Sequence, residues 1–182
     1  MPLRGGPWHL VVLVFLFAVA AVLAALLEPL PPLLSGKARA SDGDTLRLAG
    51  DRIRLIGLDA PELDQTCIDA SGTTWSCGRE SSQRLHELIG NGTVSCATEG
   101  RDKYGRYLGR CTVDGKDLGA TLVAEGFAVA SFPSYGAEEA LARREKRGIW
   151  TGSFDTPREW RDTHGDSATG FDLLGWIRSL FG

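Results

Sequence analysis

The stretch DGDTLRLAGDRIRLIGLDAPE, residues 42–62, decides the fold that the sequence predicts. Apolar and polar residues largely alternate in residues 45–48 and again in residues 53–56, and Ala49-Gly50-Asp51 separates the two runs. Alternation on both sides of a Gly-Asp pair predicts a β-hairpin. Because neighbouring side chains on a strand point to opposite faces, Arg54 is predicted to point away from the core.

Three carboxylates flank this hairpin, because Asp44 precedes it and Asp59 and Glu62 lie on the turn that follows. Pro61 fixes its own backbone and favours an extended conformation in the residue before it, so this turn is a rigid corner. Carboxylate and carbonyl oxygens suit Ca²⁺ or Mg²⁺ better than zinc. Beside Arg54, they indicate a metal-assisted phosphate site. The alternative is that DGD is an ordinary turn and that the acid after proline simply faces water.

The composition indicates one domain with appendages: the chain has 182 residues, of which 43% are hydrophobic and 24% are charged. The formal net charge is −3. Proteins that coat nucleic acids without specificity usually have a basic surface, because their phosphate contacts release counterions. The mildly acidic balance therefore argues against that class.

Residues 10–27 form an unbroken run of 18 apolar residues. As a helix this run would span about 27 Å, close to the thickness of a bilayer core. Arg4 precedes it and Glu28 follows it, which predicts a cytoplasmic N-terminus. We expect residues 1–27 to be a short cytoplasmic stub and a transmembrane signal anchor, with the remainder outside the cytoplasm. The alternative is secretion after cleavage, although the small-residue sites at 18–20 and 38–40 fit poorly.

The four cysteines lie in the part that we expect to be exported, which favours disulfides. We expect Cys67 to pair with Cys77, closing a loop, and Cys96 to pair with Cys111, joining two strands. A zinc site is the alternative, but the sequence has no C-x-x-C motif.

The remainder of the chain divides into a Pro-rich linker over 28–36, a domain over 37–162, and a tail over 163–182. Within the domain, spacing and turn residues predict a polar loop, helices and strands, in the order loop 63–78, helix 79–89, strands 93–98 and 107–113, a helix ending at 126, and helix 138–147. The tail is a polar linker and a short amphipathic helix over 171–181, which would lie on a membrane, dock on a partner or pack on its own domain.

Several motifs occur in one order: DGDT, IRLIGLDAPE, CG before a helix, DKYGR, LVAEGFA and ARREKRGIW. In this order they resemble the staphylococcal nuclease (thermonuclease) family over about residues 37–160. The resemblance implies an α+β fold, a five-stranded OB-type β-barrel with three helices, here preceded by the transmembrane helix. It also implies cleavage of DNA and RNA phosphodiesters with Ca²⁺.

The resemblance implies a role for individual residues. The metal ligands are Asp44, Asp59 and, through its backbone carbonyl, Ala60; the catalytic residues are Arg54, Glu62 and Arg106. Substrate contacts are expected from Lys103 and Tyr104 of the DKYGR loop, unless these are plain surface residues of a turn. Where the family has base-stacking tyrosines, this chain offers Phe132 and Tyr135.

The sequence therefore predicts a membrane-anchored, Ca²⁺-dependent nuclease of low sequence specificity that acts on single-stranded or frayed DNA and RNA. No protein partner is predicted. The first alternative is a non-catalytic OB-fold module that binds single strands or a protein. Carboxylates around an anionic ligand argue against it, because they would repel phosphate unless a cation intervened. The second is a membrane tether whose terminal helix recruits a partner.

Overall fold

The computed structural model describes residues 7–26 and 32–164. The chain divides into two units, residues 1–31 and 32–182, which we describe separately. The predicted C-terminal helix over 171–181 lies outside the described residues.

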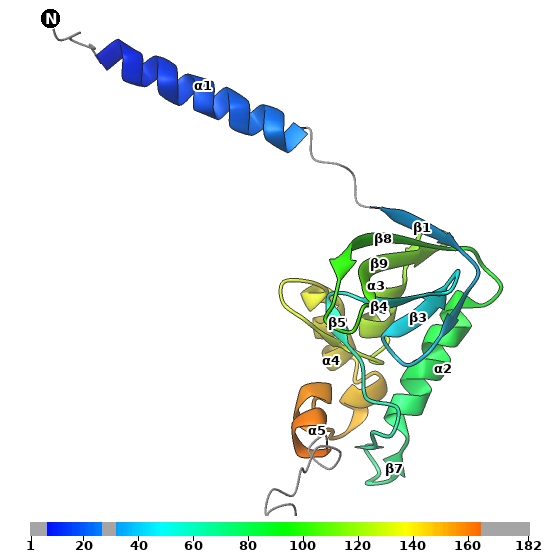
Figure 1. Ribbon diagram of the computed structural model, residues 1–182. Helices are drawn as coiled ribbons and strands as arrows, with labels where there is room; N and C mark the ends of the chain where they lie inside the picture. The colour runs from blue at the N-terminus through cyan, green and yellow to red at the C-terminus, as the bar shows by residue number, and fades with distance from the viewer. Residues whose placement is uncertain (1–6, 27–31, 165–182) are drawn as a thin grey trace, which may run out of the picture. The chain divides into compact units, whose positions relative to one another are not determined.

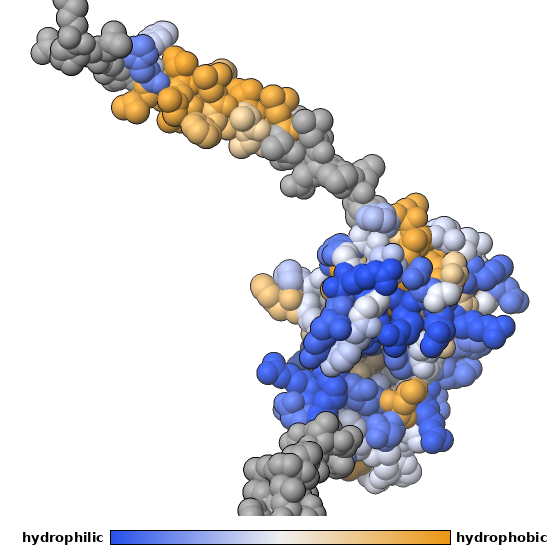
Figure 2. All heavy atoms as spheres, viewed as in Figure 1, coloured by the Kyte–Doolittle hydropathy of each residue, from blue (hydrophilic) through white to orange (hydrophobic). Residues whose placement is uncertain are grey.

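Helix α1 (Pro7–Leu26) is the described part of the first unit. Its large apolar side chains are exposed, with Leu10 and Phe17 each 70% accessible, and Figure 2 shows them as a hydrophobic surface along the helix. Among the described residues, no helix is long and apolar enough to cross a membrane. The predicted transmembrane helix is therefore not confirmed.

The second unit is built on a seven-stranded mixed sheet (Figure 1). Its strand order is β1-β8-β9-β4-β3-β2. Strand β10 lies off this path and also pairs with β9. The strands are β1 (Leu33–Gly36), β2 (Ala38–Ala40), β3 (Thr45–Leu48), β4 (Asp51–Leu55), β8 (Val94–Arg101), β9 (Tyr107–Val113) and β10 (Lys116–Asp117). The β4–β9 pair is parallel, and every other pair in this sheet is antiparallel.

The predicted five-stranded barrel with three helices is only partly right. The described residues form an α+β fold with five α-helices, and the main sheet has seven strands, six on the path and β10 beside it. Strand β1 also lies inside the predicted linker over 28–36. Strands β1 and β2 stand at the two ends of the strand order, although only Lys37 separates them in the chain.

The predicted hairpin is confirmed as β3–β4, in which Thr45 lies opposite Arg54 and Leu46 lies opposite Ile53. The apolar side chains of both strands are buried: Leu46, Leu48, Ile53 and Leu55 are at most 2% exposed. Arg54 emerges on the other face and is partly exposed. The alternation in the sequence thus determines which face of the hairpin carries the arginine.

Four α-helices and one 3₁₀ turn accompany the sheets, and α2 and α3 pack against the main sheet. They are α2 (Cys77–Ile89), α3 (Leu118–Ala124), α4 (Gly136–Arg144), α5 (Pro157–His164) and a 3₁₀ turn over Gly148–Thr151. Leu85 and Ile89 of α2 pack with Leu118 and Leu122 of α3 against the sheet residues. Two small sheets pair β5 (Leu58–Asp59) with β11 (Val129–Ala130), and β6 (Cys67–Ile68) with β7 (Thr74–Trp75).

Both predicted disulfides are confirmed. Cys96 and Cys111 lie opposite each other on β8 and β9, inside the core. Cys67 and Cys77 instead form a separate small cluster with Ile149, against which Trp75, Trp150 and Phe154 pack. The predicted loop over 63–78 is therefore a disulfide-bonded structure containing the β6–β7 hairpin, and it packs against residues from the end of the folded unit.

Candidate active site

One cleft, with a volume of about 390 Å³, gathers most of the predicted site residues. They come from the start of β3, from β4, from the corner after β5, from the β8–β9 loop and from α5. The cleft is lined by Asp42, Gly43, Asp44, Arg54, Ala60, Pro61, Glu62, Lys103, Tyr104, Arg106 and Arg161.

From this cleft, Arg54 pairs with two carboxylates, of which Asp44 lines the cleft and Asp59 does not. Its Nη1 lies 2.7 Å from Oδ2 of Asp44, and its Nη2 lies 2.9 Å from Oδ1 of Asp59. Asp44 is only 5% exposed, and burial raises the pKa of its carboxyl to about 7, although the Arg54 guanidinium acts in the opposite direction. Thr45 donates a further hydrogen bond to Asp44 Oδ1 at 3.0 Å. A buried carboxylate of this kind is stabilised in its charged form by a nearby cation.

The corner after β5 is held by close packing. A Cβ added to Gly43 would lie 2.7 Å from the Cβ of Ala60, and one added to Gly78 would lie 1.6 Å from the carbonyl oxygen of Glu62. Both positions therefore require glycine, because the corner touches the backbone before β3 and at the start of α2. Ala60 itself is 4% exposed and packs in the core.

Arg106 is held by its own loop. Its Nε lies 2.8 Å from Oδ2 of Asp102, while the backbone N–H groups of Tyr104 and Arg106 both donate to Oδ1 of Asp102. The Nη1 of Arg106 donates to the Thr45 hydroxyl at 3.3 Å, which directs the guanidinium toward the Asp44 end of the cleft. Asp102 was not among the predicted site residues, although an aspartate at the start of a turn such as DKYGR commonly accepts from nearby backbone amides.

A third guanidinium, that of Arg161 on α5, was also missed. Its Nη2 lies 2.7 Å from Oδ2 of Asp59, and its Nη1 lies 2.7 Å from Oε1 of Glu62. These carboxylates lie about a hundred residues before it in the chain. No local pattern in PREWR distinguishes such an arginine from a solvent-exposed one.

The predicted substrate contacts divide into two groups. Lys103 and Tyr104 line the cleft, with Tyr104 62% exposed. Tyr135 does not line it: its hydroxyl donates to Asp117 at 3.1 Å and accepts from Arg110 at 3.1 Å. Phe132, three residues earlier, is 99% exposed.

The donors suit a hard divalent cation that keeps part of its coordination sphere for other ligands. In the described part of the chain, no group of three or more His, Cys, Asp or Glu side chains is arranged to hold a metal ion. Asp44 and Asp59 instead share one guanidinium, so two carboxylates face the same region. Ions such as Mg²⁺ are commonly held by one or two carboxylates together with water and substrate phosphate. The pair fits that mode of binding.

Comparisons with known proteins identify the family of this chain. A family model described as staphylococcal nuclease homologue matches residues 52–152. The chain therefore belongs to the staphylococcal nuclease family, as the motifs predicted. It is 37% identical over 146 residues to the succinoglycan biosynthesis protein ExoI of Rhizobium meliloti, covering 72% of this chain and 74% of that protein.

Other relatives carry nuclease names. The chain is 32% identical over 130 residues to an uncharacterized endonuclease of Escherichia coli O157:H7, covering 65% of this chain and 78% of that protein. It is 30% identical over 148 residues to endonuclease YhcR of Bacillus subtilis, covering 68% of this chain but 12% of that protein. Membership of the family and these relatives support a nuclease that hydrolyses phosphodiester bonds.

Proposed function

We propose that this protein is a Ca²⁺-dependent nuclease that hydrolyses DNA and RNA with low sequence specificity, preferring single or frayed strands. The observation that carries the proposal is the position of Arg54, which lies in the cleft with Asp44, Glu62 and Arg106 and also pairs with Asp59. A binding module has no need of three carboxylates around an anionic ligand, because they repel phosphate.

The side chains of the cleft divide the chemistry between them. Arg54 and Arg106 bind the non-bridging oxygens of the scissile phosphate, where negative charge grows as water attacks phosphorus. Glu62 orients the attacking water and accepts its proton, and the ester oxygen departs with the electron pair of the broken P–O bond. Asp44, Asp59 and the Ala60 carbonyl would hold Ca²⁺, which when bound neutralises phosphoryl charge.

The test is digestion of single-stranded DNA by the full-length chain, with Ca²⁺ and with EDTA. We expect activity with Ca²⁺, steep loss with EDTA, and a loss of about 10²-fold or more in turnover for Glu62→Gln. Asp64→Asn is a matched control, because it neutralises a nearby exposed acid that does not line the cleft. Equal cleavage by Glu62→Gln and the unaltered chain would contradict the mechanism. Strand binding without cleavage would favour the OB-fold binding module.

We further propose that the protein is held in a membrane by residues 1–27, with the nuclease domain outside the cytoplasm. The support is the apolar run over residues 10–27 and the cysteines beyond it. Alkaline extraction of membranes tests the anchor: an anchored chain stays in the pellet, and a chain cleaved and secreted leaves it. Protease accessibility in intact cells tests the orientation.

A further inference from the structure

The guanidinium of Arg161 covers carboxylate oxygens that the proposed function needs. Both oxygens of Asp59 accept hydrogen bonds from it, Oδ1 from Nη1 at 3.1 Å and Oδ2 from Nη2 at 2.7 Å. The same Nη1 lies 2.7 Å from Oε1 of Glu62. One side chain on α5 thus binds both the expected metal ligand and the residue expected to handle water.

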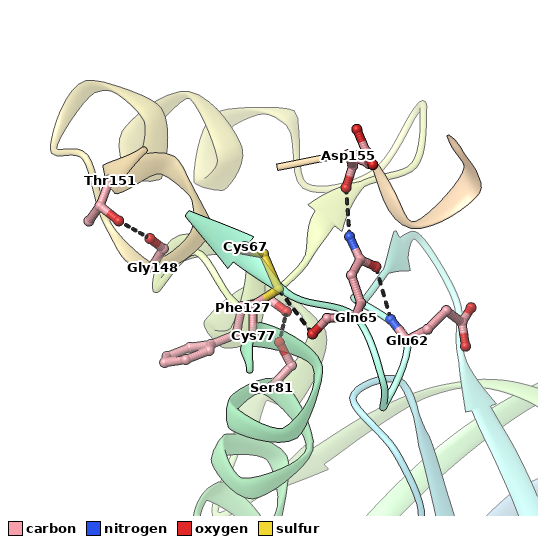
Figure 3. The surroundings of a disulfide bond; sticks show 9 residues. All are labelled: Glu62, Gln65, Cys67, Cys77, Ser81, Phe127, Gly148, Thr151 and Asp155. Atoms are coloured by element: carbon pink, nitrogen blue, oxygen red, sulfur yellow. Dashed lines mark hydrogen bonds between the residues drawn. A yellow bond between two sulfur atoms is a disulfide. The ribbon is translucent and has the colours of Figure 1, made fainter. Parts of the chain in front are cut away.

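A buried glutamine, Gln65, joins the Glu62 corner to the segment that leads into α5 (Figure 3). Gln65 is fully buried, accepts from the backbone N–H of Glu62 at 3.1 Å and donates to the backbone carbonyl of Asp155 at 2.7 Å. Asp155 lies two residues before α5 begins at Pro157. The Glu62 corner and the start of α5 are therefore joined through one side chain, which keeps Arg161 within reach of the carboxylates.

A cation that binds Asp59 meets positive charge on two sides. Oδ1 of Asp59 already accepts from Arg54 as well as from Arg161, and Oδ2 accepts from Arg161. Arg54 is fixed in the centre of the sheet path, whereas the side chain of Arg161 is 42% exposed. Of the two guanidiniums, that of Arg161 is therefore the one that can move away from Asp59 into solvent.

We propose that Arg161, which also binds Glu62, is a tethered cation that competes with the divalent metal ion for Asp59. In the metal-free protein it neutralises these carboxylates and positions them in the cleft. Metal binding displaces it from Asp59, and its guanidinium then lies at the rim of the cleft. This inference rests on the proposed function, because the competing ion is the one proposed there.

Calorimetric titration of the full-length protein with Ca²⁺ tests the competition directly, without reference to activity. Arg161→Gln is expected to bind Ca²⁺ about tenfold more tightly than the unaltered chain, because a repelling unit charge has been removed from a few ångströms away. Arg161→Lys keeps the charge but loses the two-pronged contact, so its affinity is expected to lie between the two. Asp59→Asn, which removes the shared carboxylate, is expected to weaken Ca²⁺ binding in every background.

Arg158→Gln is the matched control, because Arg158 is an exposed arginine of the same helix that makes no ion pair or side-chain hydrogen bond with the described residues. Its Ca²⁺ affinity should equal that of the unaltered chain. Thermal unfolding verifies that each variant is folded. If Arg161→Gln does not fold, the Ca²⁺ affinity of Arg161→Lys tests the competition in its place.

The outcomes separate this inference from the proposed function. Ca²⁺-dependent cleavage with unchanged or weaker Ca²⁺ binding in Arg161→Gln overturns the competition and leaves the proposed function standing. No Ca²⁺ binding by any variant overturns both. Tighter binding in Arg161→Gln without any cleavage of DNA or RNA supports the competition and overturns the nuclease.

Discussion

Arg54 and Arg161 bind the same carboxylate, Asp59, from two differently built walls of the cleft. Arg54 is five residues from Asp59 in sequence and lies on β4, between β3 and β9. Arg161 is 102 residues from Asp59 and lies on the eight-residue helix α5. The first wall is fixed by backbone ladders on both sides, whereas α5 belongs to no sheet and its preceding segment is held by one Ile68–Ser153 bridge and by the Gln65 side chain. We infer that the first wall holds the Arg54 charge in a fixed position. The second wall carries Arg161, the guanidinium that exchanges with a metal ion.

The largest loss of activity is expected from a substitution in the first wall, the β4 wall that carries Arg54, which we call the rigid wall. Arg54→Ala removes the guanidinium that joins Asp44 and Asp59, and we expect turnover on single-stranded DNA to fall by about 10²- to 10³-fold, the range seen when one charge-stabilising donor is deleted. The control is Arg47→Ala, an exposed arginine on the neighbouring strand β3 that does not line the cleft. Equal rates for both variants in a digestion assay would show that the rigid wall carries no charge chemistry.

The two disulfides provide the next comparison, because one joins β8 to β9 in the sheet and the other joins β6 to α2, beside the Gln65 link to the second wall. Their sequence separations of 15 and 10 residues are similar, so each double Cys→Ser variant should lose about 3 kcal/mol of unfolding free energy in urea. Only loss of Cys67–Cys77 should also reduce activity under conditions in which the protein stays folded. The reason is that Cys77 Sγ lies 3.5 Å from the carbonyl oxygen of Gln65, beside the link to α5.

The activity of the Cys96–Cys111 variant serves as the internal control, since those residues pack in the main core away from the cleft lining. If both disulfide variants lost activity only in proportion to their loss of stability, the Cys67–Cys77 bond would have no separate effect on the second wall.

The rigid wall could be predicted from sequence because its geometry is local. Alternation over residues 45–48 and 53–56 determines the face of Arg54, and Pro61 marks the corner that carries Glu62. The disulfide partners also followed from the order of strands and loops. The cleft residues from Asp44 to Glu62 therefore come together much as the pattern predicts.

The second wall could not be predicted, because its contacts join distant parts of the chain. Arg161 reaches carboxylates about a hundred residues earlier, and Gln65 joins backbone groups of residues 62 and 155. A glutamine in a polar loop and an arginine in a charged tail have no periodicity that reveals such partners. Strand β1 was missed for a similar reason: its pairing with β8, about 60 residues later, outweighs the linker-like composition before it.

Gln65→Met tests the link between the walls at nearly constant side-chain volume. We expect a loss of about 2 kcal/mol in unfolding free energy, because the amide of Glu62 and the carbonyl of Asp155 each lose a partner. Ca²⁺ binding should tighten as in Arg161→Gln but to a lesser extent, since Arg161 keeps its charge and loses only its fixed position. Gln83→Met, an exposed position on α2, is the control, and its unfolding free energy should hardly change.

The smallest effect is expected at the start of α5. The Thr156 hydroxyl accepts from the Glu159 backbone N–H at 3.3 Å, while the Glu159 carboxylate accepts from the Thr156 backbone N–H at 2.8 Å, so these residues cap the helix reciprocally. Thr156→Ala removes half of this arrangement and should cost about 1 kcal/mol of unfolding free energy. Because Gln65 still binds the carbonyl of Asp155, just before α5, we expect cleavage to change less than threefold. A loss of activity as large as that of Arg54→Ala would mean that cleavage depends on a fixed position of α5, which contradicts an Arg161 that a metal ion displaces.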